Sequence, residues 1–262
     1  MKSVISINNL SYSIDSTNIL LNCTLQINKG DLVCLLGLNG CGKTTLLSCI
    51  FGFNKISKNT VFLYDTDIQK LSRRQIAQTI SFVPQTIDNH SSLSCLEYLS
   101  LGRLPYKKLN EKLNEVDLDI IHKTVSELGI SYLLHRNMDV LSGGEKQLVM
   151  IATSLIQDTD VIIMDEPTSA LDYKNQSILL QLIQHLNSIG KTILFSTHNP
   201  NHALSLNARL CIMDKGTIIT VDECKKCINS GILEKIYDNK IEIIKATNSV
   251  VCTYNINNVK GN

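Results

Sequence analysis

Long hydrophobic runs are missing from this sequence of 262 residues. No apolar stretch reaches the ~18 residues that a membrane-spanning helix needs, so the sequence predicts no transmembrane segment. The N-terminal segment, MKSVISINNLSYSID, is too short and too polar for a secretory leader. If the protein serves a membrane, we expect it to do so from the cytoplasmic side through a partner.

An excess of charge of either sign is missing as well. The 25 lysines and arginines are balanced by 24 aspartates and glutamates, which leaves a formal net charge of +1. A chain that binds nucleic acid mainly through bulk positive charge is therefore not expected, although a local basic patch remains open. Hydrophobic residues make up 44% of the chain, which is enough for a sizeable core and excludes wholesale disorder.

The sequence also lacks a regular cysteine framework. The nine cysteines are spread irregularly, and an odd count in a chain of this size is typical of unpaired thiols in a reducing compartment. Cys224 and Cys227 form the one close pair, with neither a second pair nor two histidines to complete a zinc site. We interpret them as incidental thiols on a surface helix.

The pattern of apolar residues predicts an α/β chain. Three continuous apolar runs are typical of strands that are buried on both faces: residues 31–36, 161–164 and 192–197. From about 92 to 157, apolar residues instead recur at helical spacing. Strand–helix–strand patterns on both sides of a helical block favour a parallel core with a helical insertion. The polar, asparagine-rich end of the chain is expected to be poorly ordered or an edge strand.

A glycine-rich segment, GLNGCGKT at 37–44, follows the first buried run and fits G-x-x-x-x-G-K-[ST] between a strand and a helix. Glycines let the backbone wrap around phosphates, and the helix N-terminus favours negative charge. Lys43 is then predicted to bridge the β- and γ-phosphates, and Thr44 to ligate Mg²⁺. A chance glycine-rich turn is the alternative. The predicted nucleotide contacts are Gly37, Asn39, Gly40, Cys41, Gly42, Lys43, Thr44 and Thr45.

Two carboxylates follow the second buried run. The apolar residues VIIM deliver Asp165 to the carboxyl edge of the sheet, where nucleotides bind in open parallel sheets. Asp165 is predicted to hold Mg²⁺ through water, and Glu166 to polarise the water that attacks the γ-phosphate. Two solvated carboxylates after a core strand are the alternative, which the phosphate loop disfavours.

A second helix start with phosphate-binding character lies at LSGGE, residues 141–145. Ser142 and two glycines precede an amphipathic helix, so we expect bare backbone donors and a hydroxyl aimed at an anion. An ordinary helix cap is the alternative. One chain then has two helix starts of this kind. A nucleotide bound between two subunits would use both, the phosphate loop of one subunit and the LSGGE segment of the other.

The motifs GLNGCGKTT, LSGGE, VIIMDEP and SALD, with a histidine after TILFST, resemble the nucleotide-binding subunits of ATP-binding cassette (ABC) transporters. They cover nearly the whole chain in the order and spacing of that family. The resemblance implies an α/β fold with a P-loop NTPase core and an N-terminal antiparallel β subdomain. It also implies an ATPase domain at 1–240, with a helical subdomain at about 88–157 inserted between the Q-loop and the Walker B strand, and a tail at 241–262.

The same resemblance assigns further site residues. Two subunits clamp two ATP molecules head to tail, and each signature binds the γ-phosphate held by the opposite subunit. Gln85 matches the Q-loop glutamine that contacts Mg²⁺ or water. Asp172 matches the D-loop aspartate that links the two sites, and His198 matches the switch histidine at the γ-phosphate. The signature residues are Ser142, Gly143 and Gly144.

The chain departs from the family pattern at three places. Glu145 stands where many members have glutamine, and little consequence is expected from this. Thr153 stands where many members have an arginine, which puts a structural hydrogen-bond network in doubt. Many members stack an aromatic residue on adenine 23 positions before the first P-loop glycine; here that position is Ile14, with Tyr12 two residues away as the alternative platform.

Two segments narrow the resemblance to one subfamily. LSRRQIAQTISFVPQ and LGRLPY, the latter at residues 101–106, resemble the corresponding segments of the importer ATPases for iron–siderophores, haem and cobalamin. An ordinary helix-ending turn is the alternative at 101–106. Implied partners are a second copy of the chain, permease subunits and, through them, a substrate-binding protein. The implied location is the cytoplasmic face of the cell membrane, and no nucleic acid is expected. An exporter ATPase and a soluble ABC ATPase, such as one in iron–sulfur cluster assembly, stay open.

Overall fold

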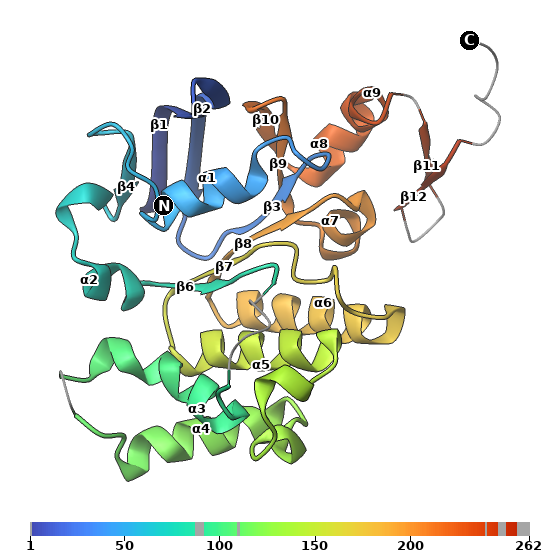
Figure 1. Cartoon of the computed structure of the whole chain (residues 1–262). Coiled ribbons are helices and arrows are strands. Elements are labelled where there is room, and N and C mark those ends of the chain that lie inside the picture. Colours follow the sequence, from blue (N-terminus) through green and yellow to red (C-terminus); the bar gives the residue numbers. More distant parts are fainter. Residues whose placement is uncertain (1, 87–91, 109–110, 239, 246–249, 256–262) are drawn as a thin grey trace. The chain divides into compact units, whose positions relative to one another are not determined.

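The chain divides into two compact units in the computed structural model (Figure 1). One unit joins residues 1–70 to residues 180–262, and the other is residues 71–179. The structure describes residues 2–86, 92–108, 111–238, 240–245 and 250–255. Across these ranges no helix combines the length and the apolar character that crossing a bilayer needs. Helices and strands alternate as expected, so the predicted α/β class is confirmed.

An antiparallel sheet opens the first unit, as the resemblance implied. Its strands lie in the order β2-β1-β4-β5. Alternate residues are buried from Cys23 to Ile27 of β2, which is the period-2 pattern of a sheet with one solvent-facing side, whereas register shifts interrupt this pattern in β1. Asp15 and Ser16 have positive φ angles, as a tight hairpin turn requires. The strands are β1 (Ser3–Ile14), β2 (Thr17–Asn28), β4 (Val61–Leu63) and β5 (Thr66–Asp67), followed by the short helix η1 (Ile68–Lys70).

A second sheet of the first unit carries strands in the order β10-β9-β3-β8. β3 is parallel to both of its neighbours, and every residue of β8 is buried, as is typical of strands in parallel sheets. Leu36 and Thr197 are paired at the ends of β3 and β8, so the segments that follow both strands leave from the same edge. These strands are β3 (Leu32–Leu36), β8 (Thr192–Thr197), β9 (Arg209–Asp214) and β10 (Thr217–Asp222).

Helices and a small hairpin complete the first unit. α1 (Lys43–Ile50) follows β3, and α7 (Pro200–Leu206) follows β8. α6 (Tyr173–Ser188) divides between the two units. After β10 the chain forms α8 (Cys224–Asn229), α9 (Ile232–Ile236), β11 (Ile241–Lys245) and β12 (Val250–Tyr254). β11 and β12 pair antiparallel, so part of the polar end is a hairpin, while residues 256–262 lie outside the described residues.

The cysteine pair lies on a surface helix, as predicted, and both side chains are on its buried face. Cys224 and Cys227 belong to α8 and are 3% and 2% exposed. Burial raises the pKa of both thiols, which keeps them protonated and unreactive. Because both side chains are buried, the pair packs as small apolar groups.

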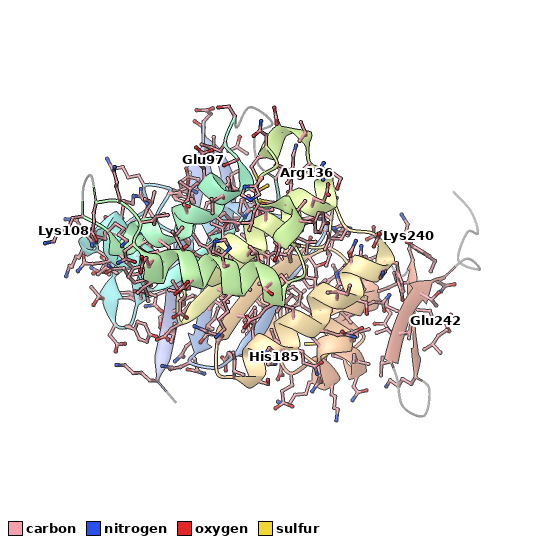
Figure 2. All side chains as sticks on the ribbon, turned by 90° about the horizontal axis from the view of Figure 1, so that it is seen from below. Glu97, Lys108, Arg136, His185, Lys240 and Glu242 are labelled. Atoms are coloured by element: carbon pink, nitrogen blue, oxygen red, sulfur yellow. The ribbon has the colours of Figure 1, made fainter. Side chains whose placement is uncertain are left out.

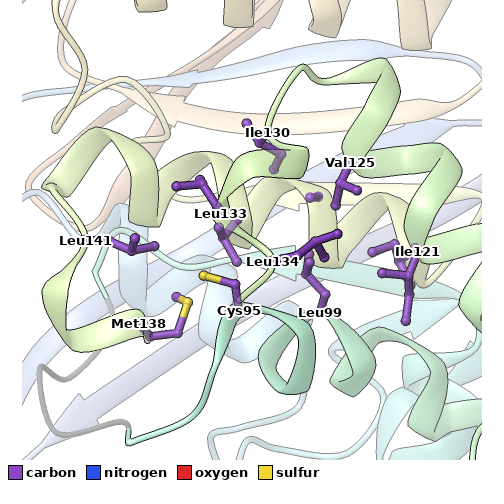
Figure 3. Packing of buried hydrophobic residues seen from close by; sticks show 12 residues of the cluster. Cys95, Leu99, Ile121, Val125, Ile130, Leu133, Leu134, Met138 and Leu141 are labelled. Carbon is purple, nitrogen blue, oxygen red and sulfur yellow. The ribbon is translucent and has the colours of Figure 1, made fainter. Parts of the chain in front are cut away.

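The second unit contains two parallel strands and a helical block. β6 (Ile80–Val83) pairs with β7 (Val161–Met164), in register from Ile80 and Val161 to Val83 and Met164. The helices are α2 (Arg73–Ala77), α3 (Cys95–Ser100), η2 (Leu101–Tyr106), α4 (Glu115–Glu127), η3 (Ser131–Leu133), η4 (Met138–Val140) and α5 (Gly143–Ile156). One apolar cluster fills the block, and Figure 3 shows Leu99, Ile121 and Leu133 among its side chains. Burial of this cluster is what holds α3, α4 and α5 together.

The segment LGRLPY forms η2, and its side chains bind inside the second unit. Arg103 bonds to the Asp117 carboxylate on α4 at 3.0 Å and to the Ile156 carbonyl on α5 at 3.0 Å. Tyr106 donates its hydroxyl hydrogen to the Gln157 carbonyl at 2.8 Å. This segment therefore ties α4 to the end of α5. Lys107 also pairs with Asp117. Burial alone would raise the pKa of the Asp117 carboxyl, but the bonds from Lys107, the Asn114 N–H and Arg103 outweigh burial and hold this pKa at about 2.

Changing Asp117 to asparagine is expected to lower the free energy of unfolding by about 2 kcal/mol at pH 7, because two cations lose a charged hydrogen-bond partner. A carboxyl whose pKa is depressed on folding stabilises the fold above its unfolded pKa, and this contribution is lost as the pH falls from about 4 to about 2. The acid sensitivity in that window should therefore weaken in the variant. Urea midpoints measured across that pH range test this. Asp119→Asn, on the exposed face of the same helix, is the control; equal midpoints for the two variants would contradict the prediction.

Candidate nucleotide site

The predicted phosphate loop lies between β3 and α1 and has a backbone that only glycine fits. A Cβ on Gly37 would stand 2.4 Å from the Met213 carbonyl oxygen, so the loop start packs directly against β9. Gly42 has a φ of +107°, and a Cβ there would meet the Met213 methyl at 2.9 Å. These contacts explain why the motif needs glycine at both places, independently of any ligand.

Gly42 is the N-cap of α1 and supplies no side chain to cap it. The first turn of α1 carries no acidic residue, so its backbone N–H groups and the positive end of its dipole face no carboxylate of their own turn. Lys43 is 5% exposed and donates from its Nζ to the carbonyls of Gly37 (2.9 Å) and Leu38 (3.1 Å). Thr44 presents an exposed side chain next to it. The loop thus gathers a cation and several N–H donors where an anion would bind.

His198 lies at the same edge of the sheet as this loop. It follows β8, and the Gly37 N–H donates to the Thr197 carbonyl at 3.4 Å, so the first loop glycine and the residue before His198 are hydrogen-bonded. The side chain of His198 is exposed. The first unit therefore brings together the phosphate loop and the predicted switch histidine.

A second histidine, which the sequence reasoning missed, supports the His198 loop. His202 is 7% exposed, and its Nδ1 lies 3.0 Å from the Thr197 hydroxyl oxygen, which also accepts from the Asn199 N–H at 3.0 Å. Burial, with a smaller effect of His198, lowers the pKa of His202, which favours a neutral ring. The signal in the sequence is a second histidine four residues after His198, in the helix that follows the strand.

In the second unit, β7 delivers Asp165 and Glu166 to its carboxyl end. Asp165 is 1% exposed and donates its N–H to the Val83 carbonyl at 2.8 Å. Gln85 follows β6, the parallel neighbour of β7, and is exposed. The second unit therefore places all three at one sheet edge. Glu166 is 8% exposed and has a φ of +44°, which a non-glycine residue adopts only where its surroundings enforce it.

The signature helix α5 starts with its own carboxylate cap. Ser142 and Glu145 form a reciprocal capping box, in which the Ser142 hydroxyl donates to the Glu145 carboxylate at 2.8 Å. Arg136, labelled in Figure 2, bonds to the other Glu145 oxygen at 3.0 Å. The expected hydroxyl is therefore not free for an anion, because it and the Ser142 N–H already donate to the Glu145 carboxylate, while the Glu145 N–H donates to the Ser142 hydroxyl oxygen at 3.3 Å. The pKa of Glu145 is lowered by these bonds.

The signature glycines lie beside the segment SALD. A Cβ on Gly143 would stand 3.6 Å from the Ala170 Cβ, and one on Gly144 would stand 3.6 Å from the Leu171 side chain. Both distances are ordinary contacts, so packing within the chain does not require glycine there. Asp172 accepts the Asn175 N–H at 2.8 Å and thereby caps α6. The second unit thus brings the signature and the predicted D-loop together.

The two candidates for adenine contact lie at the end of β1 and differ in burial. Ile14 is 48% exposed, whereas Tyr12 is partly buried and is paired with Leu20. The register of β1 against β2 shifts between Tyr12 and Ser13. An exposed aliphatic side chain at position 14 can still pack on a base, although it offers no π-face.

Ile14→Tyr is expected to tighten ATP binding by up to about tenfold, because base–aromatic stacking stabilises by roughly 1–3 kcal/mol. Titration of ATP against the wild type and this variant measures the effect. Tyr12→Ala is the discriminating companion: a strong loss of affinity in Tyr12→Ala with no gain in Ile14→Tyr would identify Tyr12 as the platform instead.

Comparison with known proteins gives one consistent result. The family model described as "ABC transporter" matches residues 20–169, which is more than half of the chain. The iron(3+)-hydroxamate import ATP-binding protein of Bacillus subtilis is 35% identical over 88% of each chain. The molybdate import ATP-binding protein of Haemophilus influenzae is 31% identical over 82% of this chain and 81% of its own.

Solved structures agree with these relatives. An inward-facing ABC transporter of metal-chelate type superposes with a TM-score of 0.81 at 27% identity, covering 97% of both chains. A bacterial ABC transporter cassette in dimeric form superposes with a TM-score of 0.74 at 26% identity, covering 84% of this chain and 98% of its own. The likeness therefore extends from the sequence motifs to the whole path of the backbone.

Proposed function

This chain belongs to the ABC transporter family, as an ATP-binding and ATP-hydrolysing subunit with a P-loop NTPase fold, and we propose that it powers the import of a ferric siderophore or a related metal chelate. One observation carries the choice of substrate: the hydroxamate-import relative is 35% identical and aligns over 88% of both chains. The near-complete overlap with a metal-chelate type transporter supports the same substrate class.

The phosphate loop, in this proposal, holds the triphosphate of ATP. Backbone N–H groups at the start of α1 and the Lys43 ammonium compensate the phosphate charge, as their placement after β3 supports. The contact set is the predicted one, from Gly37 to Thr45. Adenine packs on the exposed Ile14, with Tyr12 as the alternative.

The predicted metal residues have the right donor chemistry for Mg²⁺. Thr44, Asp165 and Gln85 offer hydroxyl, carboxylate and amide oxygens, which are the hard ligands that this cation takes, and they include no sulfur or imidazole. These residues would hold it together with phosphate oxygens. Once bound, Mg²⁺ would supply positive charge against the developing charge on the transferred phosphoryl group.

The chemical step is assigned to Glu166, His198 and Gln85. Glu166 accepts a proton from the attacking water, and its enforced backbone conformation at the end of β7 supports a fixed position for that carboxylate. His198, exposed at the edge that holds the phosphate loop, contacts the γ-phosphate. Gln85 contacts Mg²⁺ or the water. Asp172 links the two sites of a dimer.

Two copies of the chain are proposed to act together. Dimeric ABC cassettes are known in the family, and Ser142, Gly143 and Gly144 then meet the γ-phosphate that the partner copy holds. Permease subunits dock on the dimer from the cytoplasmic face of the membrane, and a substrate-binding protein delivers the cargo to them. ATP-driven closure and reopening after hydrolysis change what the permease contacts.

Uptake by cells tests the proposed substrate. A strain that lacks this chain is expected to lose accumulation of ⁵⁵Fe supplied as a ferric hydroxamate, and the wild-type sequence should restore it whereas Glu166→Gln should not. Radiolabelled haem, cobalamin and molybdate are supplied in parallel. Normal ⁵⁵Fe accumulation without the chain would overturn the siderophore assignment. Loss of molybdate uptake alone would favour the second candidate, an oxyanion importer, which the Haemophilus relative supports.

A further inference from the structure

The C-terminal hairpin is bound to the start of helix α7, directly after the His198 loop. The Asn201 side chain donates to the Cys252 carbonyl at 2.9 Å and accepts the Cys252 N–H at 2.7 Å. Its amide therefore takes the place of a neighbouring strand along β12. The hairpin is closed at its other end, where the Asn255 N–H donates to the carbonyl of Lys240, a residue labelled in Figure 2.

A tyrosine between α9 and β11 reaches the backbone of His198 itself. The Tyr237 hydroxyl donates to the His198 carbonyl oxygen at 2.5 Å. Burial is the main reason that the pKa of Tyr237 is raised, so this hydroxyl keeps its proton and remains a donor throughout the physiological range. A hydrogen bond to this carbonyl fixes the peptide plane between His198 and Asn199, and thereby the direction in which the imidazole leaves the backbone.

The hydrogen bonds of Tyr237 and Asn201 lie beside a space that side chains do not fill. A cavity of about 280 Å³ lies between the His198 loop and the hairpin, and Pro200, Ile241, Cys252 and Tyr254 are among the residues that line it. Side chains therefore do not fill the space beside the loop, and the loop has room to shift on that side. The hydrogen bonds from Tyr237 and Asn201 join residues that line the two sides of this cavity.

We propose that Tyr237 is a positioning residue for His198, and that the hairpin β11–β12 supports it by its attachment to Asn201. This inference rests on the proposed role of His198 at the γ-phosphate. Tyr237 acts through the backbone of His198, so it affects the hydrolysis step and leaves nucleotide binding to the phosphate loop. Tyr237, 39 residues after the histidine, thus becomes part of the hydrolytic apparatus.

The conservative variant Tyr237→Phe tests this in the full-length chain. It removes the hydroxyl and keeps the ring, so folding should be retained. We expect kcat for ATP to fall about three- to tenfold, the factor that corresponds to one net hydrogen bond, with KM for ATP unchanged. Tyr254→Phe, at the end of β12 and 83% exposed, is the matched control and should keep the wild-type kcat.

A spectroscopic readout separates positioning from general loosening. In nucleotide-free protein with ¹⁵N-labelled histidine, the His198 ring signals are assigned by their loss in His198→Ala. These signals should shift or broaden in Tyr237→Phe and in Asn201→Ala, and stay in place in Tyr254→Phe. A merely structural role would instead lower the melting temperature and leave the His198 signals where they are, which overturns the inference.

The outcomes also distinguish this inference from the proposed function. If His198→Ala loses hydrolysis but Tyr237→Phe keeps both the wild-type kcat and the wild-type His198 signals, the positioning role is overturned alone. If His198→Ala hydrolyses ATP at the wild-type rate, the role of His198 fails, and the inference fails with it. A kcat loss in Tyr237→Phe together with displaced His198 signals supports the inference.

Discussion

The Glu166→Gln variant is expected to bind ATP normally and to hydrolyse it at least about a hundredfold more slowly than the wild type. The amide has the shape of the carboxylate and leaves the backbone unchanged, including the positive φ angle at this position. It has no proton-accepting carboxylate, so the attacking water is no longer polarised. Because reopening follows hydrolysis, the variant should accumulate as a closed, ATP-bound dimer.

Phosphate release measures the rate of hydrolysis, and size-exclusion chromatography with ATP measures the accumulation of the dimer. Glu97→Gln is the control, because it makes the same change at a carboxylate that only caps α3 in the same unit. Lys43→Ala offers a contrast, since it should lose nucleotide binding itself. Turnover by Glu166→Gln near the wild-type rate would show that another group activates the water.

The positions of the predicted site residues were accessible from sequence because they depend on local patterns. Short apolar runs mark β3, β7 and β8, and in parallel strands the chemistry follows the carboxyl ends. Gly37, Asp165 and His198 therefore lie directly after buried strands, as predicted. Their roles in ATP hydrolysis stay predictions that the variants above test.

The remaining features depend on contacts that no local pattern carries. The bonds between Asn201 and Cys252 join residues 51 positions apart, and neither residue type by itself predicts such a partner. The burial of Cys224 and Cys227 depends on what packs over α8. The capping box at Ser142 is different, because the local pattern S-x-x-E predicts the helix cap that was the alternative at this position.

Ser142, the residue of that capping box, also provides the test of a nucleotide site shared between two copies of the chain. The Ser142→Arg variant is expected to bind ATP as a monomer with nearly wild-type affinity, because the phosphate loop belongs to the other unit of its own chain. ATP-driven dimerisation should be abolished, since a bulky cation would occupy the place where the partner's γ-phosphate must approach an exposed helix start. Hydrolysis should fall with it, because each site of the proposed dimer needs both copies. Light scattering with and without ATP, beside a nucleotide-binding titration, measures these effects.

A loss of dimers in Ser142→Arg has a second possible cause, because removing the N-cap itself destabilises α5 by about 1 kcal/mol. Ser94→Arg controls for this. Ser94 caps α3 through the same reciprocal bonds to a glutamate, Glu97, and lies in the same unit. It should lose similar stability and still form dimers with ATP, since no nucleotide is proposed to meet that helix start. If both variants lost dimerisation equally, cap removal would be the cause; if Ser142→Arg dimerised normally, a signature shared between subunits would be excluded.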